Sequence, residues 1–393
     1  MTESAPAPRR RRKPSLARRA QRAADAFVNG LDWWMREPEQ VVDRTPWRPI
    51  LQRDKLTVRR YTAAAGDEDW GLGAVLDGPT KQRVPVLLVP PLMVKPFIFD
   101  LVPDRSLVRT LLGAGFDVTL VDFGEPDAAD ERVRLDDYVL DWLPAAIEAT
   151  KADTGADQVA LCGYCMGGLF ALMTTAVGDP TRAGDGPRDD IAAIVTIGSP
   201  IDSAKMGVLS VLARLLHRQV DFVSERLGNV PGELSSQVFK WMSPWKSMTR
   251  HADLFLHLYD QTWVDGHDAL SAWTGNFIDY PGDAFRQLMD DFMTGNKLKD
   301  GRMRFGARTA DLSRLRVPVL AFAGETDNVV RPEAVHELMS AVGSADKEVR
   351  MAPGGHMGVF AGSRAPTAVW RPAVAWLRER LANASGAIAP GGS

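Results

Sequence analysis

The chain has 393 residues, of which 45% are hydrophobic and 25% are charged, and its formal net charge is −3. These values are typical of a globular protein large enough for one α/β domain with an insertion or for two domains. No apolar run reaches the roughly 20 residues that a membrane-spanning helix needs, and no apolar segment follows the basic N-terminal run as in a signal peptide. We therefore expect a cytoplasmic protein. Two cysteines, Cys162 and Cys165, do not suffice for a disulfide framework or a structural zinc site.

The N-terminal segment is basic at first and then amphipathic. Residues 1–14 are polar, proline-bearing and rich in arginine, which is typical of disorder. A helix is predicted from Ser15 because apolar residues recur at steps of three and four, at Leu16, Ala20, Ala24, Phe27, Leu31 and Trp34. Two interpretations stay open: the helix packs on the main domain, or it touches a membrane, a lipid-coated inclusion or an acidic partner.

Short apolar runs separated by helical stretches fill most of the remaining chain. An antiparallel edge pair is predicted between Lys55 and Gly78, from the stretches LTVRRYTA and AVLDG. The buried strands that follow are predicted at Val84–Val89, Phe116–Val121, Val159–Cys162, Ile191–Ile197, Val317–Ala323 and Glu348–Ala352. Alternation of such strands with helices predicts an α/β fold whose mostly parallel sheet is covered on both faces.

The strand series is interrupted between Ile201 and about Phe305, which predicts a mainly helical cap at about 202–305. Four tryptophans are concentrated there, namely Trp241, Trp245, Trp263 and Trp273. They would suit an apolar acyl tunnel, or they pack within the cap as buried tryptophans commonly do. We assign 1–50 to the basic tail and amphipathic helix, 51–385 to the main domain with the cap, and 386–393 to a flexible tail.

The stretch from Val159 to Gly168, VALCGYCMGG, places a cysteine between glycines where a predicted strand meets a predicted helix. This pattern is typical of a nucleophile elbow, whose tight turn requires small neighbours, here Gly163 and Gly167. The helix N-terminus favours a thiolate at Cys165, and the N–H of Met166 can face a developing oxyanion. The structural alternative is a cysteine that acts only as a small buried apolar residue.

An acid and a histidine follow the cysteine in the order that a hydrolase triad requires. Asp327 comes just after a predicted strand in AFAGETDNVVRP, and His356 follows the last predicted strand in APGGHMG. The order nucleophile, acid, histidine is that of the α/β-hydrolase fold. Asp327 could instead cap the following helix, and His356 could be an ordinary loop histidine. The carboxylates and histidine near Asp327 do not have metal-site spacing, so we expect no metal.

With these residues the sequence resembles the polyhydroxyalkanoate (poly-3-hydroxybutyrate) synthase family, whose lipase-like box carries cysteine. The resemblance spans roughly residues 84–363. It includes GYCMGG, VPPLMVKPFIFDLVPDRSLVRTLLGAGFDVTLVDFGEPD, FIDYPGDAFRQLMDDFMTGNKLKDGRM, DLSRLRVPVLAFAGETDNVVRPE and GGHMGVFAG. Three positions depart from the family pattern. Val94 stands where asparagine is usual, Phe123 stands where tryptophan is usual, and Asn328 stands where histidine is often found.

The resemblance implies an acyltransferase that polymerises 3-hydroxyacyl-CoA and releases CoA. Cys165 would be acylated, neutral His356 would take its proton, and Asp327 would orient the imidazole. The N–H groups of Met166 and Met93 would hold the oxyanion. The CoA thioester would be the substrate, with no separate cofactor. The chain's length is similar to that of synthases that work with a second subunit.

Several alternatives stay open at this point. A homo-oligomer and attachment of the N-terminus to a polymer inclusion or lipid surface are both compatible with the sequence, and no nucleic-acid partner is expected. The main competing function is a thiol-dependent hydrolase, either an acyl-CoA thioesterase or a polyester depolymerase, because the same fold supports both reactions. The other is a catalytically weak protein that binds an inclusion or membrane surface through its N-terminus.

Overall fold

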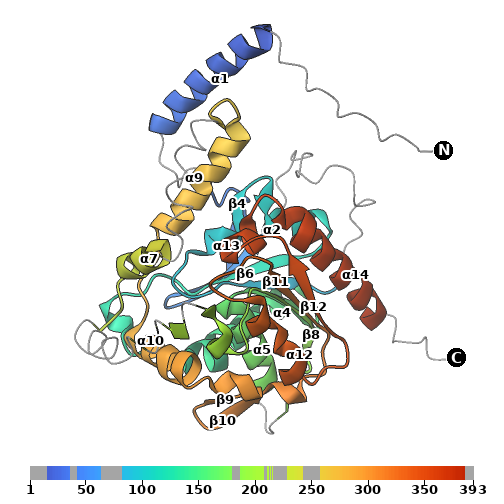
Figure 1. Ribbon diagram of the computed structural model, residues 1–393. Coiled ribbons are helices and arrows are strands. Elements are labelled where there is room, and N and C mark those ends of the chain that lie inside the picture. Colours follow the sequence, from blue (N-terminus) through green and yellow to red (C-terminus); the bar gives the residue numbers. More distant parts are fainter. Residues whose placement is uncertain are drawn as a thin grey trace, which may run out of the picture.

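The computed structural model describes residues 16–35, 42–62, 82–178, 186–207, 210, 211, 213, 215, 228–241 and 257–385. Its centre is an eight-stranded sheet in the order β1-β2-β6-β3-β7-β8-β11-β12 (Figure 1). The strands are β1 (Trp47–Arg53), β2 (Leu56–Tyr61), β3 (Val86–Val89), β6 (Val118–Asp122), β7 (Val159–Tyr164), β8 (Ile191–Ile197), β11 (Val319–Gly324) and β12 (Lys347–Ala352). From β6 to β12 all neighbours are parallel. The predicted α/β-hydrolase fold is confirmed.

Alternation along each strand distributes its side chains between two apolar clusters. In β7, Val159 and Leu161 face one cluster while Ala160, Cys162 and Tyr164 face the other. The first cluster is covered by α4 (Leu143–Thr154), α5 (Met166–Val177), α11 (Pro332–His336) and α12 (Leu338–Ala341). The second is covered by α2 (Leu107–Gly113), α13 (His356–Ala361) and α14 (Arg371–Ser385). The continuous apolar strand sequences therefore reflect burial on both faces.

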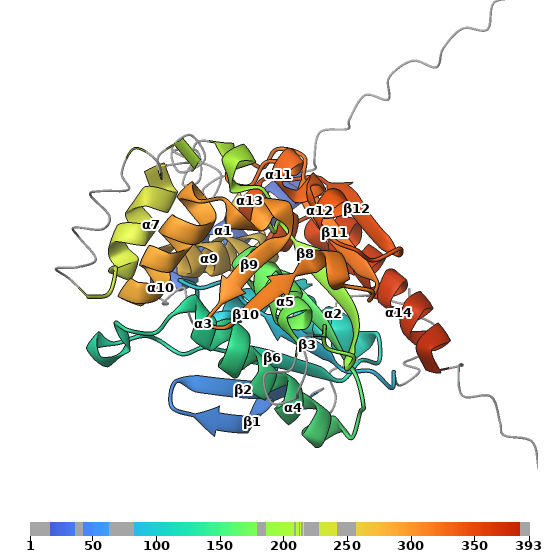
Figure 2. The same cartoon turned by 90° about the horizontal axis from the view of Figure 1, so that it is seen from below.

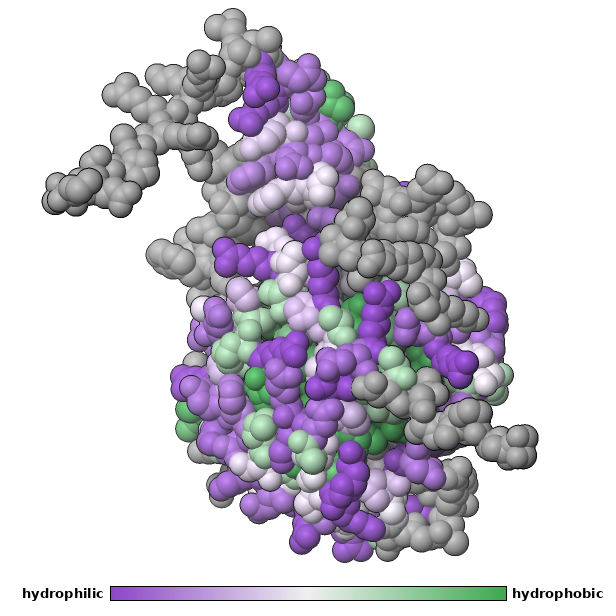
Figure 3. All heavy atoms as spheres, turned by 90° about the vertical axis from the view of Figure 1, so that its right-hand side faces the viewer, coloured by the Kyte–Doolittle hydropathy of each residue, from purple (hydrophilic) through white to green (hydrophobic). Residues whose placement is uncertain are grey.

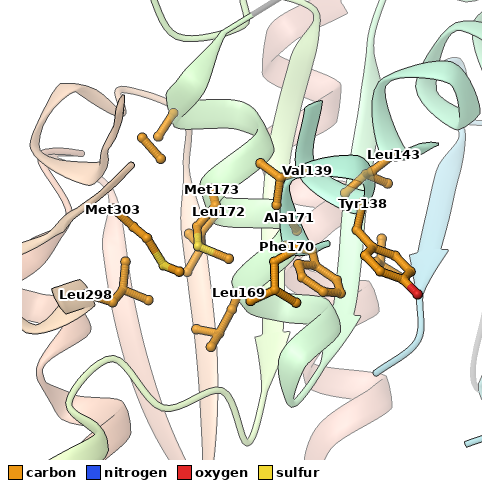
Figure 4. Packing of buried hydrophobic residues seen from close by; sticks show 14 of the residues in the cluster. Tyr138, Val139, Leu143, Leu169, Phe170, Ala171, Leu172, Met173, Leu298 and Met303 are labelled. Carbon is orange, nitrogen blue, oxygen red and sulfur yellow. The ribbon is translucent and has the colours of Figure 1, made fainter. Parts of the chain in front are cut away.

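Helix α5 lies inside the first cluster, so the position of the elbow is fixed by packing. The ring of Phe170 stacks on Tyr138 at 5.6 Å between centroids, and Met173 and Leu172 face the region of Leu298 and Met303 (Figure 4). The hairpin of β9 (Arg302–Phe305) and β10 (Arg308–Asp311) also lies against α5 (Figure 2). Truncation of a fully buried Phe170 to alanine would cost about 3 to 5 kcal/mol of stability.

An antiparallel edge pair is present, and LTVRRY is one of its strands. LTVRRY forms β2, and β1 lies on one side of it, with Trp47 opposite Tyr61. The other side of β2 pairs with β6. The second stretch predicted for the edge pair, AVLDG, lies outside the described residues. A proline at position 49 is tolerated in β1 because this strand lies at the sheet edge. β1 also begins four residues before the expected domain boundary at 51.

Two helical stretches are interrupted. Between α3 (Leu135–Asp137) and α4 the chain makes a π-type turn over Tyr138–Trp142, because Pro144 has no N–H to continue the regular ladder. The helical stretch after β11 divides into α11 and α12 at Glu337.

The described part of the predicted cap is mainly helical, with α7 (Gly232–Trp241), α9 (Gln261–Gly275) and α10 (Gly282–Gln287). Trp273 is buried and Trp263 is half-buried. Trp245 and the side chain of Trp241 lie outside the described residues. Near its end the region also contains β9, and the short pair of β4 (Asp100–Val102) and β5 (Arg105–Ser106) completes the described strands.

The N-terminal helix α1 (Leu16–Met35) is present as predicted and packs against the cap helix α9. Trp33 donates from Nε1 to Asp268 at 2.9 Å, and Asn29 donates to the carbonyl of Leu258 at 2.7 Å. Figure 3 shows α1 at the top with apolar side chains along one edge. Phe27 and Met35 are among its exposed side chains. Both interpretations of this helix therefore have support. In the described part of the chain, no helix has the length and apolar character needed to cross a membrane.

Candidate active site

Cys165 occupies a strained turn between β7 and α5. Its φ is 51° and its ψ is −117°, a conformation that a side chain rarely adopts and that costs about 1 to 3 kcal/mol. The turn is fixed by hydrogen bonds on both sides of the residue. The N–H of Cys165 donates to the carbonyl of Ile197 at 2.8 Å, and its own carbonyl accepts from Ser199 Oγ at 2.7 Å and from Gly168 N–H at 3.1 Å. The cysteine as a whole is half-buried.

The three glycines around Cys165 are required by close contacts. A Cβ on Gly167 would lie 2.0 Å from the carbonyl oxygen of Val89. A Cβ on Gly163 would lie 2.4 Å from the backbone of Gly167, and one on Gly168 would lie 2.2 Å from Ser199 Oγ. Because the first two obstacles are backbone atoms, they cannot move aside. The glycine pattern of the sequence thus has a direct steric cause.

His356 and Asp327 come from two neighbouring parallel strands. Asp327 follows β11, and His356 follows β12 as the first residue of α13. His356 Nδ1 lies 2.8 Å from Asp327 Oδ2, and the other oxygen of Asp327 accepts the N–H groups of Val329 and Val330 at 2.9 and 2.8 Å. Both side chains are buried. The carboxylate therefore cannot rotate without losing bonds, and it fixes the orientation of the imidazole through Nδ1.

The electrostatics of the site favour a protonated His356. Burial alone would lower the pKa of His356, but the charge of Cys165 and the hydrogen bonds to Asp327 and Cys165 outweigh it and raise that pKa to about 10. Burial raises the pKa of the other cysteine, Cys162, to about 12, so it stays a thiol. The two cysteines therefore have different chemical roles. Cys165 interacts electrostatically with His356, and Cys162 is an inert core residue.

The loop after β3 lies against the elbow, since Gly167 approaches Val89 and Pro90. Met93 has a φ of 71°, which is unusual for a residue with a side chain. Its carbonyl accepts from the N–H of Ile278 in the cap at 3.0 Å, and Val94 bridges to Phe277. The loop is thus clamped between the elbow and the cap. Met166 is the first residue of α5, directly after Cys165.

A cavity lies beside this loop. Its walls include Pro91, Met93, Phe123, Tyr138 and Ile278. Cys165 and His356 are not among its walls, so this cavity and the nucleophile are separate features joined through the loop.

The three positions that depart from the family pattern lie outside the hydrogen bonds between Asp327 and His356. Val94 is part of the cap bridge, and Phe123 packs edge-on against Tyr138 at 4.9 Å. Asn328 is exposed. Val94 therefore contributes a backbone bridge, and Phe123 contributes a ring contact.

Two residues in contact with the site were not singled out from the sequence. Tyr164 precedes Cys165, and its hydroxyl donates to the backbone carbonyl of His356 at 3.2 Å. Ser199 holds the carbonyl of Cys165 from the loop after β8. The alternation of β7 could have indicated Tyr164, because every second residue of that strand faces the cluster that contains α13. Nothing local marks Ser199.

The comparisons with known proteins agree with this geometry. The family described as alpha/beta hydrolase fold matches residues 99–363. A soluble variant of monoglyceride lipase from Saccharomyces cerevisiae, solved with a substrate analog, shares the fold with a TM-score of 0.50 and 14% identity, over 88% of this chain and 98% of that one.

Curated relatives are considerably closer in sequence. The poly(3-hydroxyalkanoate) polymerase subunit PhaC of Haloferax mediterranei is 31% identical over 87% of this chain and 65% of its own length. The protein of the same name from Allochromatium vinosum is 30% identical over 86% of this chain and 89% of its own length. The chain therefore belongs to the poly(3-hydroxyalkanoate) polymerase family, whose members are enzymes with the α/β-hydrolase fold.

Proposed function

We propose that this chain polymerises 3-hydroxyacyl groups from CoA thioesters through an acyl intermediate on Cys165 and releases CoA. The observation that carries the proposal is the linked arrangement of a strained elbow cysteine, a histidine whose pKa is raised by that cysteine, and an aspartate 2.8 Å from the same histidine. The named activity of the PhaC relatives supports the polymerising outcome.

The raised pKa of His356 suits this side chain to take the proton of Cys165 in the first step of the proposed cycle. With that pKa at about 10, an imidazole that has accepted the proton keeps it at neutral pH. The resulting thiolate attacks the thioester carbonyl. The tetrahedral intermediate collapses as the carbon–sulfur bond to CoA breaks, and His356 gives its proton to the departing CoA sulfur.

The second half of the cycle forms the ester. The hydroxyl of another 3-hydroxyacyl unit gives its proton to the now neutral His356, and its oxygen attacks the acyl group on Cys165. The bond between the acyl carbon and Cys165 breaks, so the thiolate and the imidazolium are restored. The N–H groups of Met166 and Met93 are the proposed donors to the oxyanion in both halves, each contributing about 3 kcal/mol to the barrier reduction.

A thiol nucleophile suits this reaction. Exchange between the substrate thioester and an enzyme thioester is nearly isoenergetic, so the acyl group stays activated until a hydroxyl attacks it. Water must be kept away during that time. The cap segment that includes Trp273 and Ile278 contacts both Tyr164 and the Met93 loop, and we assign the exclusion of water to it.

The experiment is an assay of the purified protein with 3-hydroxybutyryl-CoA that follows free CoA and separates polymer from free acid. Wild type should release CoA and form polymer, and Cys165→Ala should do neither. Cys162→Ala is the matched control, since it removes a thiol from the preceding strand but not from the elbow, and it should keep the activity.

Other outcomes would discriminate between the remaining functions. CoA release with free acid as the sole product would contradict the polymerase proposal in favour of the hydrolase. Some relatives are named as polymerase subunits, so the assay should be repeated with a candidate second subunit and with longer acyl chains. Failure under all these conditions would contradict the proposal.

A further inference from the structure

The residue before the nucleophile makes a direct hydrogen bond to the residue that serves as its base. The Tyr164 hydroxyl donates to the backbone carbonyl of His356 at 3.2 Å, across 192 positions of sequence. Tyr164 ends β7 and is followed immediately by Cys165, while His356 begins α13. One side chain therefore connects the strand that carries the thiol to the helix that carries the imidazole.

The ring of Tyr164 is held by aromatic neighbours, so its hydroxyl has a defined position. It stacks on Phe360 with 4.2 Å between centroids and 17° between planes. Trp273 from the cap helix α9 meets it edge-on at 5.9 Å. The imidazole of His356 lies 5.2 Å from the ring centroid. Burial, with the nearby charges of Cys165 and Asp327, raises the pKa of Tyr164 well above its ordinary value, so its hydroxyl remains a donor.

The edge of the imidazole lies close to Gly198. A Cβ on Gly198 would lie 3.3 Å from His356 Cε1, and Gly198 has a φ of +62° that favours glycine. Asp327 therefore contacts the imidazole at Nδ1, and Gly198 lies at the edge of the imidazole. Tyr164 donates to the backbone carbonyl of His356 and lies against the face of its ring. Of these contacts, the hydrogen bond from Tyr164 is the one made by β7, the strand that leads into Cys165.

We propose that Tyr164 is a positioning residue that sets the distance and orientation between His356 and Cys165. The inference rests on the proposed function in taking these two residues as nucleophile and base. Tyr164 touches neither the acyl group nor CoA in this role; it acts through His356. Loss of its hydroxyl would leave the ring packed and let α13 shift relative to β7.

The test uses Tyr164→Phe, which removes one oxygen and keeps the aromatic packing. Tyr61→Phe is the matched control, because Tyr61 is also buried and donates a hydrogen bond, at 3.4 Å to Asp43, on the edge strand β2. Two measurements need no acyl-CoA: the titration of His356 by NMR, and the rate at which iodoacetamide alkylates Cys165, located by peptide mass spectrometry. They remain decisive even if the polymerase assignment fails.

In Tyr164→Phe the pKa of His356 should fall, and alkylation at pH 7 should slow about threefold to tenfold, the equivalent of one net hydrogen bond. The difference should close at high pH, where the thiol ionises without help from the imidazole. Tyr61→Phe should match wild type in both measurements. A Tyr164→Phe protein that titrates and alkylates like wild type would overturn the proposal, whatever happens to its melting temperature.

A second variant separates packing from positioning. Tyr164→Leu loses both the ring and the hydroxyl, so it should be less stable than Tyr164→Phe. If the hydroxyl positions His356, the two variants should share the lowered pKa of His356. If only Tyr164→Leu shows it, the ring rather than the hydrogen bond does the positioning, and the proposal as stated fails.

Discussion

Asp327 holds His356 with one carboxylate oxygen and the following backbone with the other. Oδ2 lies 2.8 Å from His356 Nδ1, and Oδ1 accepts the N–H groups of Val329 and Val330. The carboxylate is thus both an orienting group for the imidazole and a cap for the turn after β11. The sequence offered these roles as alternatives, and the structure shows that one side chain makes both sets of contacts.

This double role can be separated by substitution. Asp327→Asn keeps an oxygen for the backbone N–H groups but presents an amide where the imidazole needs an acceptor, so kcat should fall by about 10² to 10⁴ with little loss of stability. Asp327→Ala should lower kcat as far. It should also lower the unfolding free energy by roughly 1 to 3 kcal/mol, because a buried and a part-buried N–H group lose their partner. Steady-state kinetics beside denaturant unfolding would check both. Equal stability losses in the two variants would contradict the division of roles.

The charge on Cys165 should be visible in the titration of His356. That charge and the hydrogen bond from the imidazolium to Cys165 raise the pKa of His356, so Cys165→Ala should lower it from about 10. The imidazolium should then lose its proton at a lower pH in the variant than in wild type, as observed by NMR of labelled histidine. Cys162→Ala should leave the pKa of His356 unchanged. An identical His356 pKa in wild type and Cys165→Ala would mean that the two side chains do not share a proton.

The elbow glycines should not tolerate a methyl group. In Gly167→Ala the new Cβ would meet the Val89 carbonyl at 2.0 Å, so β3 and α5 must move apart. We expect a loss of several kcal/mol or more, or failure to fold, beyond the range of ordinary point substitutions, which is about 0.5 to 3 kcal/mol. Gly275→Ala at the end of α9 is the control, since nothing lies within 4 Å of its Cβ position. Thermal unfolding of the two variants would compare them; a stable, active Gly167→Ala protein would contradict the steric argument.

A buried ion pair far from the site should govern acid stability. The pKa of Asp190 is lowered to about 2: burial alone would raise it, but hydrogen bonds from Arg188 and Lys151 outweigh that effect. A lowered carboxylate pKa contributes stability that is present above the unfolded value near 3.8 and is lost as pH falls through about 2. Asp190→Asn should therefore cost roughly 1 to 2 kcal/mol at pH 7, allowing for partial solvent screening.

That cost should disappear in acid. Urea unfolding of wild type and Asp190→Asn from pH 7 to pH 2 should show the two curves converging below about pH 3. Parallel curves over the whole range would indicate that the substitution acts through packing and not through charge.

The docking of α1 on the cap should depend on Trp33. Its indole donates at 2.9 Å to Asp268, which is buried on α9. Trp33→Phe removes this bond, at a cost of about 1 to 3 kcal/mol for a hydrogen bond to a charged group. Hydrogen exchange in α1 should become faster while the rest of the protein is unchanged. Phe27→Ala on the exposed face is the control and should not alter hydrogen exchange. Equal effects of the two substitutions on exchange would contradict the role of the Trp33 hydrogen bond in docking α1.

Much of the fold was predictable because buried parallel strands have an unmistakable composition. Ile191–Ile197 was predicted to the residue, and the other buried strands to within two residues. The partner of LTVRRY was missed because edge strands such as Trp47–Arg53 carry charge and a proline and lack the apolar signal.

The candidate site was predictable where chemistry dictates the residue type. Cys165, Asp327 and His356 could be found from glycines, strand ends and their order along the chain. Ser199 could not, because its role depends on which backbone carbonyl lies opposite it in three dimensions. The alternation of β7 indicates the face on which Tyr164 lies, but not the carbonyl to which its hydroxyl donates. The charge state of His356 was also beyond the sequence, since it depends on how burial balances two neighbouring groups.

If Cys165 carries the acyl group, trapping of the acyl intermediate should reveal it. The protein should be mixed with 3-hydroxybutyryl-CoA, quenched in acid within the first turnovers, digested and analysed by mass spectrometry. We expect a 3-hydroxybutyryl adduct on the peptide at Cys165, none at Cys162, and a stronger signal in Asp327→Asn if ester formation slows more than acylation. CoA release without any adduct at Cys165, or an adduct at another side chain, would contradict the acyl intermediate on Cys165.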